Sequence, residues 1–198
     1  MEARPYLMSR LPMADSSKPQ RKSIRLKNYD YSTPGYYFVT ICTEGRKCLL
    51  GEIHDGKMEL NPLGEKVQAV WSDLPKHCPG VELDIFVVMP NHLHGVLALN
   101  VGAGSHARPG AGQAQRPAPT LSLPDVIQRF KSFSTHLYRE TLAKTGNSFS
   151  TKLWQRNYYE HVIRRDESLE KIRKYIQENP LKWDLDEDNP LNITSPKK

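Results

Sequence analysis

The segment Val87-Val88-Met89-Pro90-Asn91-His92-Leu93-His94-Gly95-Val96 decides how we interpret the fold of this chain. Apolar residues continue on both sides of it. Proline offers no backbone N–H to a sheet, so one uninterrupted strand through Pro90 is disfavoured. The pattern therefore predicts two neighbouring strands, at 83–89 and 92–99, with Pro90-Asn91 near the turn between them.

Two histidines, His92 and His94, lie two residues apart in this segment. Side chains on a strand alternate between faces, so both imidazoles point to one side of the sheet and Leu93 to the other. Neutral imidazole is a common metal ligand, and two of them on one face can share an ion. The same spacing also arises by chance in ordinary strands beside a turn, so the pair alone leaves both interpretations open.

The composition is that of a globular chain with a basic surface. The chain has 198 residues and a formal net charge of +6, a length typical of one domain with a substantial core. A pI near 9.2 favours a polyanionic partner. There is no stretch of about 18 apolar residues and no signal-like N-terminus, so we expect a cytoplasmic protein without a membrane partner. The three cysteines match no metal knuckle and are expected to be free thiols.

Local patterns predict further strands and helices around the histidine segment. Residues 36–43 are aromatic and β-branched, which indicates a strand inside a sheet. His54-Asp55-Gly56 predicts the turn of a hairpin between 48–53 and 57–60. Apolar stripes and end signals predict a helix that begins at Asn61-Pro62 and ends at Pro79-Gly80, and two more at 126–141 and 166–179.

The chain divides into three parts by composition. Residues 1–27 form a basic flexible N-terminal arm, residues 28–183 the main domain, and residues 184–198 a C-terminal tail. Within the domain, Gly, Ala and Pro dominate residues 101–120, and this predicts a mobile insertion that does not pack.

The last predicted helix carries Tyr175 and Asn179, four positions apart. Their side chains lie one above the other, at the edge of the apolar stripe formed by Leu169, Ile172 and Ile176. Packing can therefore hold Tyr175 while its hydroxyl reaches a cleft. A core-edge tyrosine with a solvated hydroxyl and an asparagine that caps the helix fit the same pattern.

Residues 149–163 combine aromatic and polar side chains. Aromatic and arginine groups near one another suit base stacking and phosphate contact. A partly buried strand or extended segment with a hydrogen-bonded His161 accounts for the same residues equally well.

Three motifs in this order resemble those of the REP-associated tyrosine transposases, of the single-tyrosine HUH transposase superfamily. They are MPNHLHG at 89–95, WQ-x-x-YYEH at 154–161 and YI-x-x-NP at 175–180, and the hydrophobic residue of the HUH motif is Leu93. The resemblance covers roughly residues 28–183. It implies an α+β, ferredoxin-like domain with a central antiparallel sheet and helices packed on it.

The resemblance also implies roles for four residues. His92 and His94 match the metal ligands of the family, Asn179 matches the position of a third, oxygen ligand, and Tyr175 matches the nucleophile. Tyr158 and Tyr159 are set aside as nucleophiles because family members can lack tyrosine there. Oxygen-rich ligation makes Mg²⁺ or Mn²⁺ the expected cofactor.

The implied activity is metal-dependent cleavage and rejoining of single-stranded DNA near hairpins, through a 5′-phosphotyrosine intermediate. The expected partner is single-stranded or hairpin DNA, and a monomer acting in cis is favoured over a dimer. Five cations are expected to contact the DNA backbone: Arg156, Arg164, Arg165, Lys171 and Lys174. Two alternatives are a domesticated DNA-hairpin-binding protein without cleavage activity and a metal phosphodiesterase that uses water in place of Tyr175.

Overall fold

A computed structural model describes residues 25–26, 28–100, 121–145, 152–186 and 188–192. The predicted insertion at 101–120 and the predicted arm up to residue 24 lie outside the described residues. The division of the chain into arm, domain and tail stays a prediction.

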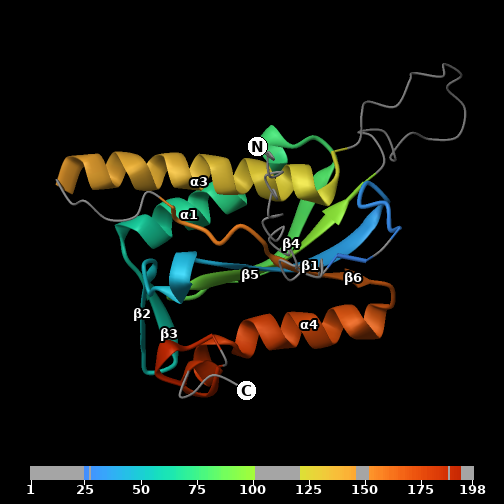
Figure 1. Ribbon diagram of the computed structural model, residues 1–198. Coiled ribbons are helices and arrows are strands. Elements are labelled where there is room, and N and C mark those ends of the chain that lie inside the picture. Colours follow the sequence, from blue (N-terminus) through green and yellow to red (C-terminus); the bar gives the residue numbers. More distant parts are fainter. Residues whose placement is uncertain (1–24, 27, 101–120, 146–151, 187, 193–198) are drawn as a thin grey trace, which may run out of the picture.

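A four-stranded antiparallel sheet forms the centre of the molecule (Figure 1). Its strands run in the order β4-β5-β1-β6, and all neighbours are antiparallel. The bounds are Gly35–Cys42 for β1, Val81–Val88 for β4, His92–Leu99 for β5 and Tyr159–Ile163 for β6. Between β1 and β4 the chain forms a small hairpin and two consecutive helices, and between β5 and β6 it forms one helix. Apart from the hairpin and the divided first helix, this is the β-α-β-β-α-β order of a ferredoxin-like fold. The expected fold class is confirmed.

Helices cover both faces of this sheet (Figure 1). Helices α1 (Pro62–Ser72) and α3 (Leu123–Thr145) lie on one face, and α4 (Asp166–Glu178) lies on the other. The larger apolar core lies beneath α1 and α3 and includes Tyr37, Leu93 and Phe130. A smaller core between the sheet and α4 comprises Phe38, Val96, Ile163, Leu169 and Ile176.

The turn between β4 and β5 is tightly anchored. The backbone N–H of Met89 donates to the carbonyl of His92 (2.8 Å), so Pro90 and Asn91 form the turn, as predicted. Two segments from outside the turn also bond to it, since Leu50 N–H donates to the Pro90 carbonyl (3.0 Å) and Thr43 N–H to the Asn91 carbonyl (2.8 Å). The start of β5, where the histidines lie, is therefore fixed from both sides.

The helix that begins after Asn61 is capped as predicted but ends earlier. Asn61 Oδ1 accepts hydrogen bonds from the backbone N–H groups of Leu63 (3.0 Å) and Gly64 (2.9 Å). We expected one helix as far as Pro79-Gly80, but α1 ends at Ser72 and a short helix α2 follows at Leu74–His77. Pro75 has no N–H with which to continue the hydrogen bonds of α1.

The remaining elements lie at one end of the sheet. Strands β2 (Gly51–His54) and β3 (Lys57–Leu60) form the predicted hairpin, and Asp55 and Gly56 of its turn both have positive φ angles (49° and 71°). A short 3-10 helix, η1, spans Glu44–Arg46, and two others, η2 (Pro180–Leu185) and η3 (Pro190–Asn192), follow α4. Among the described residues, no helix is long and apolar enough to cross a bilayer.

Candidate metal centre and tyrosine

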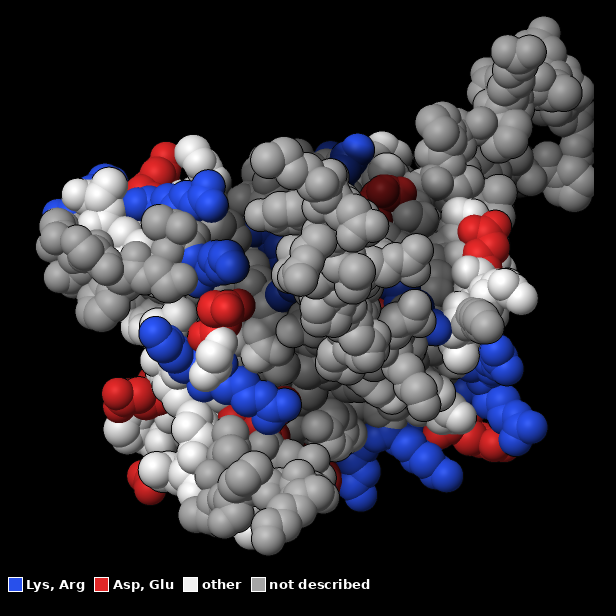
Figure 2. Space-filling model, in the orientation of Figure 1, with Lys and Arg blue, Asp and Glu red and all other residues white. Residues whose placement is uncertain are grey.

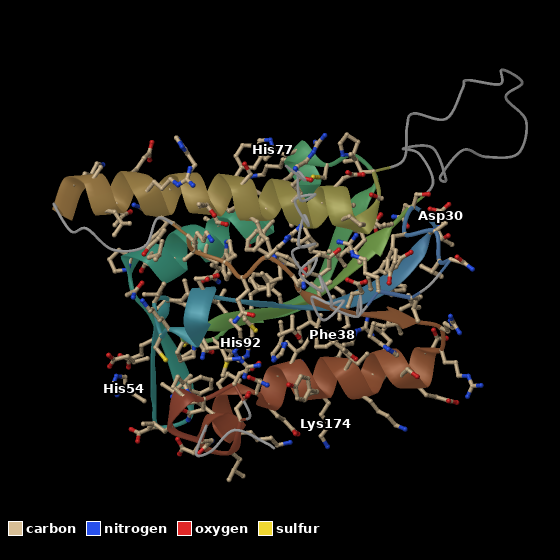
Figure 3. All side chains as sticks on the ribbon, in the orientation of Figure 1. Asp30, Phe38, His54, His77, His92 and Lys174 are labelled. Atoms are coloured by element: carbon tan, nitrogen blue, oxygen red, sulfur yellow. The ribbon has the colours of Figure 1, made fainter. Side chains whose placement is uncertain are left out.

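His92 and His94 lie on the face of β5 that is turned toward α4 and the chain after it. Figure 3 shows His92 below the sheet, near the segment that follows α4, and Phe38 above α4. Both imidazoles are buried, with exposed fractions of 0% and 3%. Their ring centroids are 4.4 Å apart. The strand alternation therefore places both rings on one side of the sheet, as predicted, while Leu93 enters the opposite core.

Each histidine uses its Nδ1 atom for a contact within the protein. His94 Nδ1 is 2.8 Å from the hydroxyl of Thr40, which pairs with His94 across the β1–β5 ladder. His92 Nδ1 is 2.8 Å from Asn91 Oδ1. The Nε2 atom of His92 is buried and has no hydrogen-bond partner among the described residues. A buried ring nitrogen without a partner is costly, so a ligand at this position would relieve a real penalty.

Burial keeps both imidazoles neutral. It is the main cause that lowers the pKa of His92 to about 3, with the positive charge of Arg46 as the second cause. Burial also lowers the pKa of His94 well below its usual 6.5, and the neighbouring His92 acts in the same direction. Neutral imidazole is the form that binds metal ions, so no proton has to leave either ring at neutral pH.

Tyr175 lies directly against this pair. Its hydroxyl is 3.2 Å from His94 Nε2, and its ring packs edge-on against Phe38. The side chain is 44% exposed, because Tyr175 lies beside the stripe of α4 that is buried through Leu169 and Ile176. The phenol is thus held by packing on one side and open to solvent on the other.

Asn179 lies at the C-terminal end of α4, one turn after Tyr175. It is 2% exposed, and its Oδ1 atom makes no hydrogen bond among the described residues. The structure therefore brings together all four residues named from the sequence, His92, His94, Tyr175 and Asn179. Two of them, His92 and Asn179, present buried polar atoms that have no hydrogen-bond partner in the part of the chain that the structure describes.

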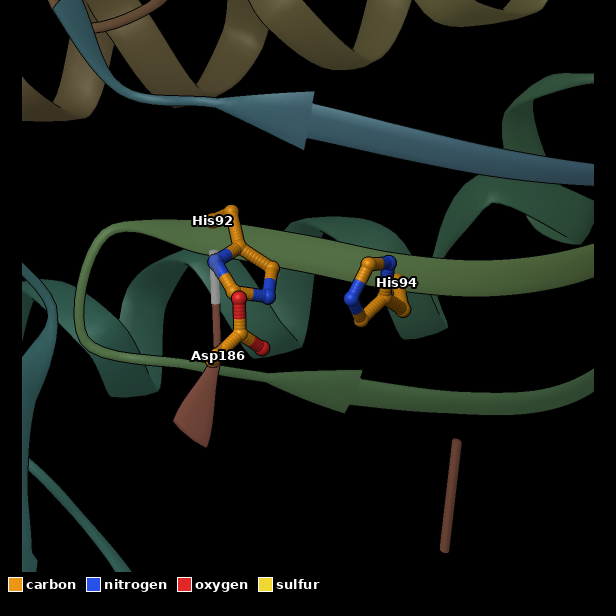
Figure 4. A group of neighbouring side chains, drawn as sticks. All are labelled: His92, His94 and Asp186. Atoms are coloured by element: carbon orange, nitrogen blue, oxygen red, sulfur yellow. The ribbon is translucent and has the colours of Figure 1, made fainter. Parts of the chain in front are cut away.

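Asp186 completes the group and was missed by the sequence analysis, which placed it in the tail. The ligand atoms of His92, His94 and Asp186 all lie within 4.8 Å of one another. Figure 4 shows both histidines extending from β5 and the Asp186 carboxylate beside them, from the chain after η2. Asp186 is one of four acidic residues within 184–188, and no motif in that segment would have singled it out. Two neutral imidazoles, a carboxylate and an amide oxygen form a donor set that suits a divalent cation.

A cleft of about 740 Å³ opens over this group. His94, Tyr175, Asn179 and Asp186 line it, together with the cations Arg46 and Lys182 and the carboxylate of Asp188. The opposite wall comes from residues 155 and 157–159 and carries the exposed ring of Tyr159. The cleft therefore combines possible metal ligands and a phenol with charged groups of both signs, and it has room for an extended ligand.

The described part of this segment, residues 152–163, has both buried and exposed side chains, and its contact with DNA stays a prediction; residues 149–151 lie outside the described residues. Trp154 and Tyr158 are buried in the larger core, and Trp154 Nε1 donates to Ser134 Oγ (2.8 Å). Gln155 Nε2 donates to the carbonyl of Thr43 (3.1 Å), the residue after β1. Tyr159, at 53% exposed, faces the cleft. The motif thus builds one wall of the cleft.

The five cations predicted to contact DNA do not form one cluster. Arg156 borders a second cleft beside α3, whereas Arg164 and Arg165 border a shallow pocket at the start of α4. Lys171 and Lys174 are exposed on α4, and Lys174 lies 3.7 Å from Glu178. Arg173, between them, binds Asp84 on β4 and Glu170.

Comparison with known proteins relates this chain to a family of transposases. The sequence profile of the family described as "Transposase IS200 like" matches residues 115–179. A Haemophilus influenzae protein without an assigned function is 40% identical over 171 residues, covering 84% of this chain and 92% of that protein. Another Haemophilus influenzae protein, provisionally named a REP-associated tyrosine transposase, is 26% identical over 159 residues. This match covers 79% of this chain and 77% of that protein.

A solved structure agrees with the fold. The structure described as a REP-associated tyrosine transposase bound to a REP hairpin matches with a TM-score of 0.50 and 19% identity, over 81% of this chain and 73% of that one. The sequence matches, the ferredoxin-like topology and the three ordered motifs agree with one another. The chain carries an IS200-like transposase domain and is homologous to the REP-associated tyrosine transposases.

Proposed function

We propose that this protein is a metal-dependent transposase that cleaves and rejoins single-stranded DNA near hairpins, with Tyr175 as the nucleophile. The observation that carries the proposal is the contact between Tyr175 and His94, 3.2 Å from hydroxyl to Nε2, beside a group of potential metal ligands. A phenol next to such a group is arranged for attack on a phosphate held in the same place.

His92, His94 and Asn179 are the proposed metal ligands, with Asp186 as an additional carboxylate. The fit is supported by His92 Nε2 and Asn179 Oδ1, two buried atoms without a hydrogen-bond partner within the described ranges. The oxygen donors favour Mg²⁺ or Mn²⁺. When bound, such an ion would polarise the scissile phosphate and offset the charge that develops on its oxygens.

The chemistry that Tyr175 would perform is a transesterification. The phenolic oxygen attacks the phosphorus, an O–P bond to Tyr175 forms, and the bond to the 3′-oxygen breaks. The phenol loses its proton to solvent, and the departing oxygen takes one up to become a 3′-hydroxyl. The resulting 5′-phosphotyrosine keeps the energy of the phosphodiester bond, so attack by a later 3′-hydroxyl rejoins two strands.

The basic surface supports DNA as the partner. Figure 2 shows Lys and Arg side chains near the end of α3, around α4 and at further places on this face, with acidic side chains among them. A second cleft, of about 690 Å³, lies beside α3, and no carboxylate among the described residues lines it. Four cations line it: Arg25, Lys131, Arg139 and Arg156. Tyr158 borders both this cleft and the one over the histidines. We propose that Arg156, Arg164, Arg165, Lys171 and Lys174 contact DNA phosphates.

One assay tests the nucleophile. The protein is incubated with Mn²⁺ and a hairpin-bearing single-stranded oligonucleotide, and covalent protein–DNA adducts are separated on a denaturing gel. We expect an adduct that disappears in Tyr175→Phe and on chelation of the metal. Tyr36→Phe is the matched control, since Tyr36 is an exposed tyrosine of β1 that lies outside the cleft, and this variant should keep the adduct.

The same assay separates the alternatives. Hairpin binding without cleavage by the unaltered protein would support a domesticated DNA-hairpin-binding protein. Metal-dependent cleavage that persists in Tyr175→Phe would support a phosphodiesterase that uses water.

The contact between Tyr175 and His94 of one chain supports action in cis by a monomer. Mixing His94→Ala chains with Tyr175→Phe chains tests this. The mixture should form no adduct, whereas recovery of the adduct would mean that one subunit of a dimer supplies its tyrosine to the metal site of the other.

A further inference from the structure

Asn91 is a fully buried residue whose side chain joins His92 to two distant segments. Its Nδ2 donates to the backbone carbonyls of Arg46 (3.0 Å) and Asp188 (2.6 Å). Its Oδ1 lies 2.8 Å from His92 Nδ1. All the polar atoms of the Asn91 amide group are thus engaged in one network.

The network fixes which way the amide points. Rotating the amide by half a turn would set Oδ1 against the carbonyl oxygens of Arg46 and Asp188. None of these three oxygens carries a hydrogen, so no hydrogen bond could form there, and the NH₂ group would lie opposite His92. The observed orientation is therefore the one that satisfies both carbonyls. Oδ1 can only accept a hydrogen bond, so the proton between it and His92 belongs to Nδ1.

We propose that Asn91 is a positioning residue that holds His92 in the Nδ1–H tautomer and so directs the Nε2 lone pair into the metal site. In neutral imidazole one nitrogen carries the proton and the other carries the lone pair. The Nε2 of His92 is the buried nitrogen without a partner among the described residues, and it faces the group that includes Asp186. This proposal rests on the proposed metal-dependent function.

The neighbouring histidine, His94, contacts no group among the described residues that would fix its tautomer. The Nδ1 of His94 faces the hydroxyl of Thr40, and its Nε2 faces the hydroxyl of Tyr175. A hydroxyl can donate or accept, so either tautomer of His94 satisfies both contacts. The structure thus assigns a fixed tautomer to His92 alone. It also links that tautomer to the position of Asp188, two residues after Asp186.

The tautomer can be measured without metal or DNA. Metal-free protein is labelled with ¹⁵N-histidine, and the His92 ring nitrogens are assigned by comparison with His92→Gln. At pH 8 we expect Nδ1 to resonate as a protonated nitrogen and Nε2 as an unprotonated one. A His92 ring protonated on Nε2 would overturn the proposal, whatever the protein does to DNA.

Substitution of Asn91 tests the effect on metal binding. In Asn91→Ala we expect His92 to lose its preference for Nδ1–H, and Mn²⁺ affinity, followed by the EPR signal of free Mn²⁺, to fall about 10–100-fold. Asn61→Ala is the matched control. The Nδ2 and Oδ1 atoms of Asn61 also form hydrogen bonds with backbone groups, but none of these bonds involves a histidine. It should lower stability and leave the tautomer and the affinity unchanged.

Asn91→Asp keeps the proposal testable if the alanine variant does not fold. The carboxylate still accepts from His92 Nδ1 but cannot donate to the carbonyls of Arg46 and Asp188. We therefore expect the Nδ1–H tautomer to persist and stability to fall. Loss of that tautomer in Asn91→Asp, or its full retention in a folded Asn91→Ala, would contradict the role assigned to Asn91. If the unaltered protein binds no Mn²⁺ but shows the expected tautomer, the proposed function fails and the role of Asn91 in setting the tautomer stands.

Discussion

At the scale of single residues, the site depends on side chains that lie on the opposite face of its strand. Gly95 follows His94, and the ring of Trp71 occupies the space that a side chain would need there. A Cβ atom at Gly95 would lie 2.5 Å from Trp71 Cζ2, well inside van der Waals contact. Trp71 itself is fully buried and packs against Phe130. The position of β5, and with it His94, is therefore set partly by this close contact.

We expect Gly95→Ala to lower the free energy of unfolding by about 1–3 kcal/mol, because the added methyl group overpacks the core. Urea unfolding measures this change. Adding Trp71→Phe in the same chain should recover part of the loss, since the smaller ring leaves space for the methyl group. A purely additive effect of the two substitutions would mean that the clash is not the cause.

Asp186 is the residue for which a substitution best tests the ligand set. We expect Asp186→Asn to weaken Mn²⁺ binding about 10-fold, because the site loses a charged oxygen donor. Asp184→Asn is the control, since Asp184 is an exposed carboxylate of the same segment. Equal effects of the two substitutions on the affinity would argue for general electrostatics and against ligation.

At the scale of elements, the position of α4 depends on an irregularity in β4. The register of β4 against β5 shifts between Leu83 and Phe86, a β-bulge that leaves one extra residue on β4. Leu83 and Phe86 pack toward the larger core, and Ile85 packs toward α4. Asp84, in the bulge, bonds to Arg173 of α4 through both carboxylate oxygens. This pair helps to fix the helix that carries Tyr175.

The pair between Asp84 and Arg173 should make stability depend on pH. The hydrogen bonds from Arg173 lower the pKa of Asp84 below its usual 3.8. The unfolded chain therefore binds this proton more readily, so the stabilisation is present above about pH 4 and is lost as the pH falls through the lowered pKa. We expect Asp84→Asn to cost about 1 kcal/mol at pH 7, after screening by solvent. Urea unfolding from pH 7 downward should show the difference from the unaltered protein shrink below pH 4; a constant difference would contradict this.

At the scale of the whole molecule, the site is a junction between segments that are far apart in the sequence. β5 supplies the histidines, α4 the tyrosine and asparagine, and the chain after η2 the carboxylate. A ligand that joins these segments binds the folded state and not the unfolded chain. It therefore stabilises the entire fold.

Mn²⁺ should accordingly raise the melting temperature. A free metal concentration 100-fold above the dissociation constant corresponds to about 2.7 kcal/mol of added stability. We expect this shift in calorimetry of the unaltered protein and its loss in His92→Ala, even if the variant melts at a lower temperature without metal. An equal shift in His92→Ala would place the metal elsewhere.

Binding of DNA should weaken with salt, because cations that contact phosphates release counterions from the DNA. Replacing Arg156 with alanine should reduce the slope of log affinity against log salt by about one phosphate contact, measured by fluorescence anisotropy with a labelled hairpin. Lys57→Ala, on the β2–β3 hairpin, should keep the original slope. If both substitutions reduce the slope equally, net charge and not a specific contact governs binding.

Local sequence patterns determined much of this protein by themselves. Pro90 interrupted the apolar run and gave two strands, the two-residue period put His92 and His94 on one face, and the helical period put Tyr175 beside the buried stripe of α4. These features depend on backbone geometry over a few residues, so they follow from the order of residues alone. The ordered motifs then identified the family, which the sequence matches confirm.

Only the tertiary structure decided which distant groups meet. No local sequence pattern places Asp186 beside the histidines. Nor does one place the amide of Asn91 between His92 and the carbonyls of Arg46 and Asp188. The bulge that turns Asp84 toward Arg173 is likewise absent from any pattern in β4. Such contacts arise from the packing of whole elements, because loop conformation and strand register bring together residues whose separation in the sequence carries no periodic signal.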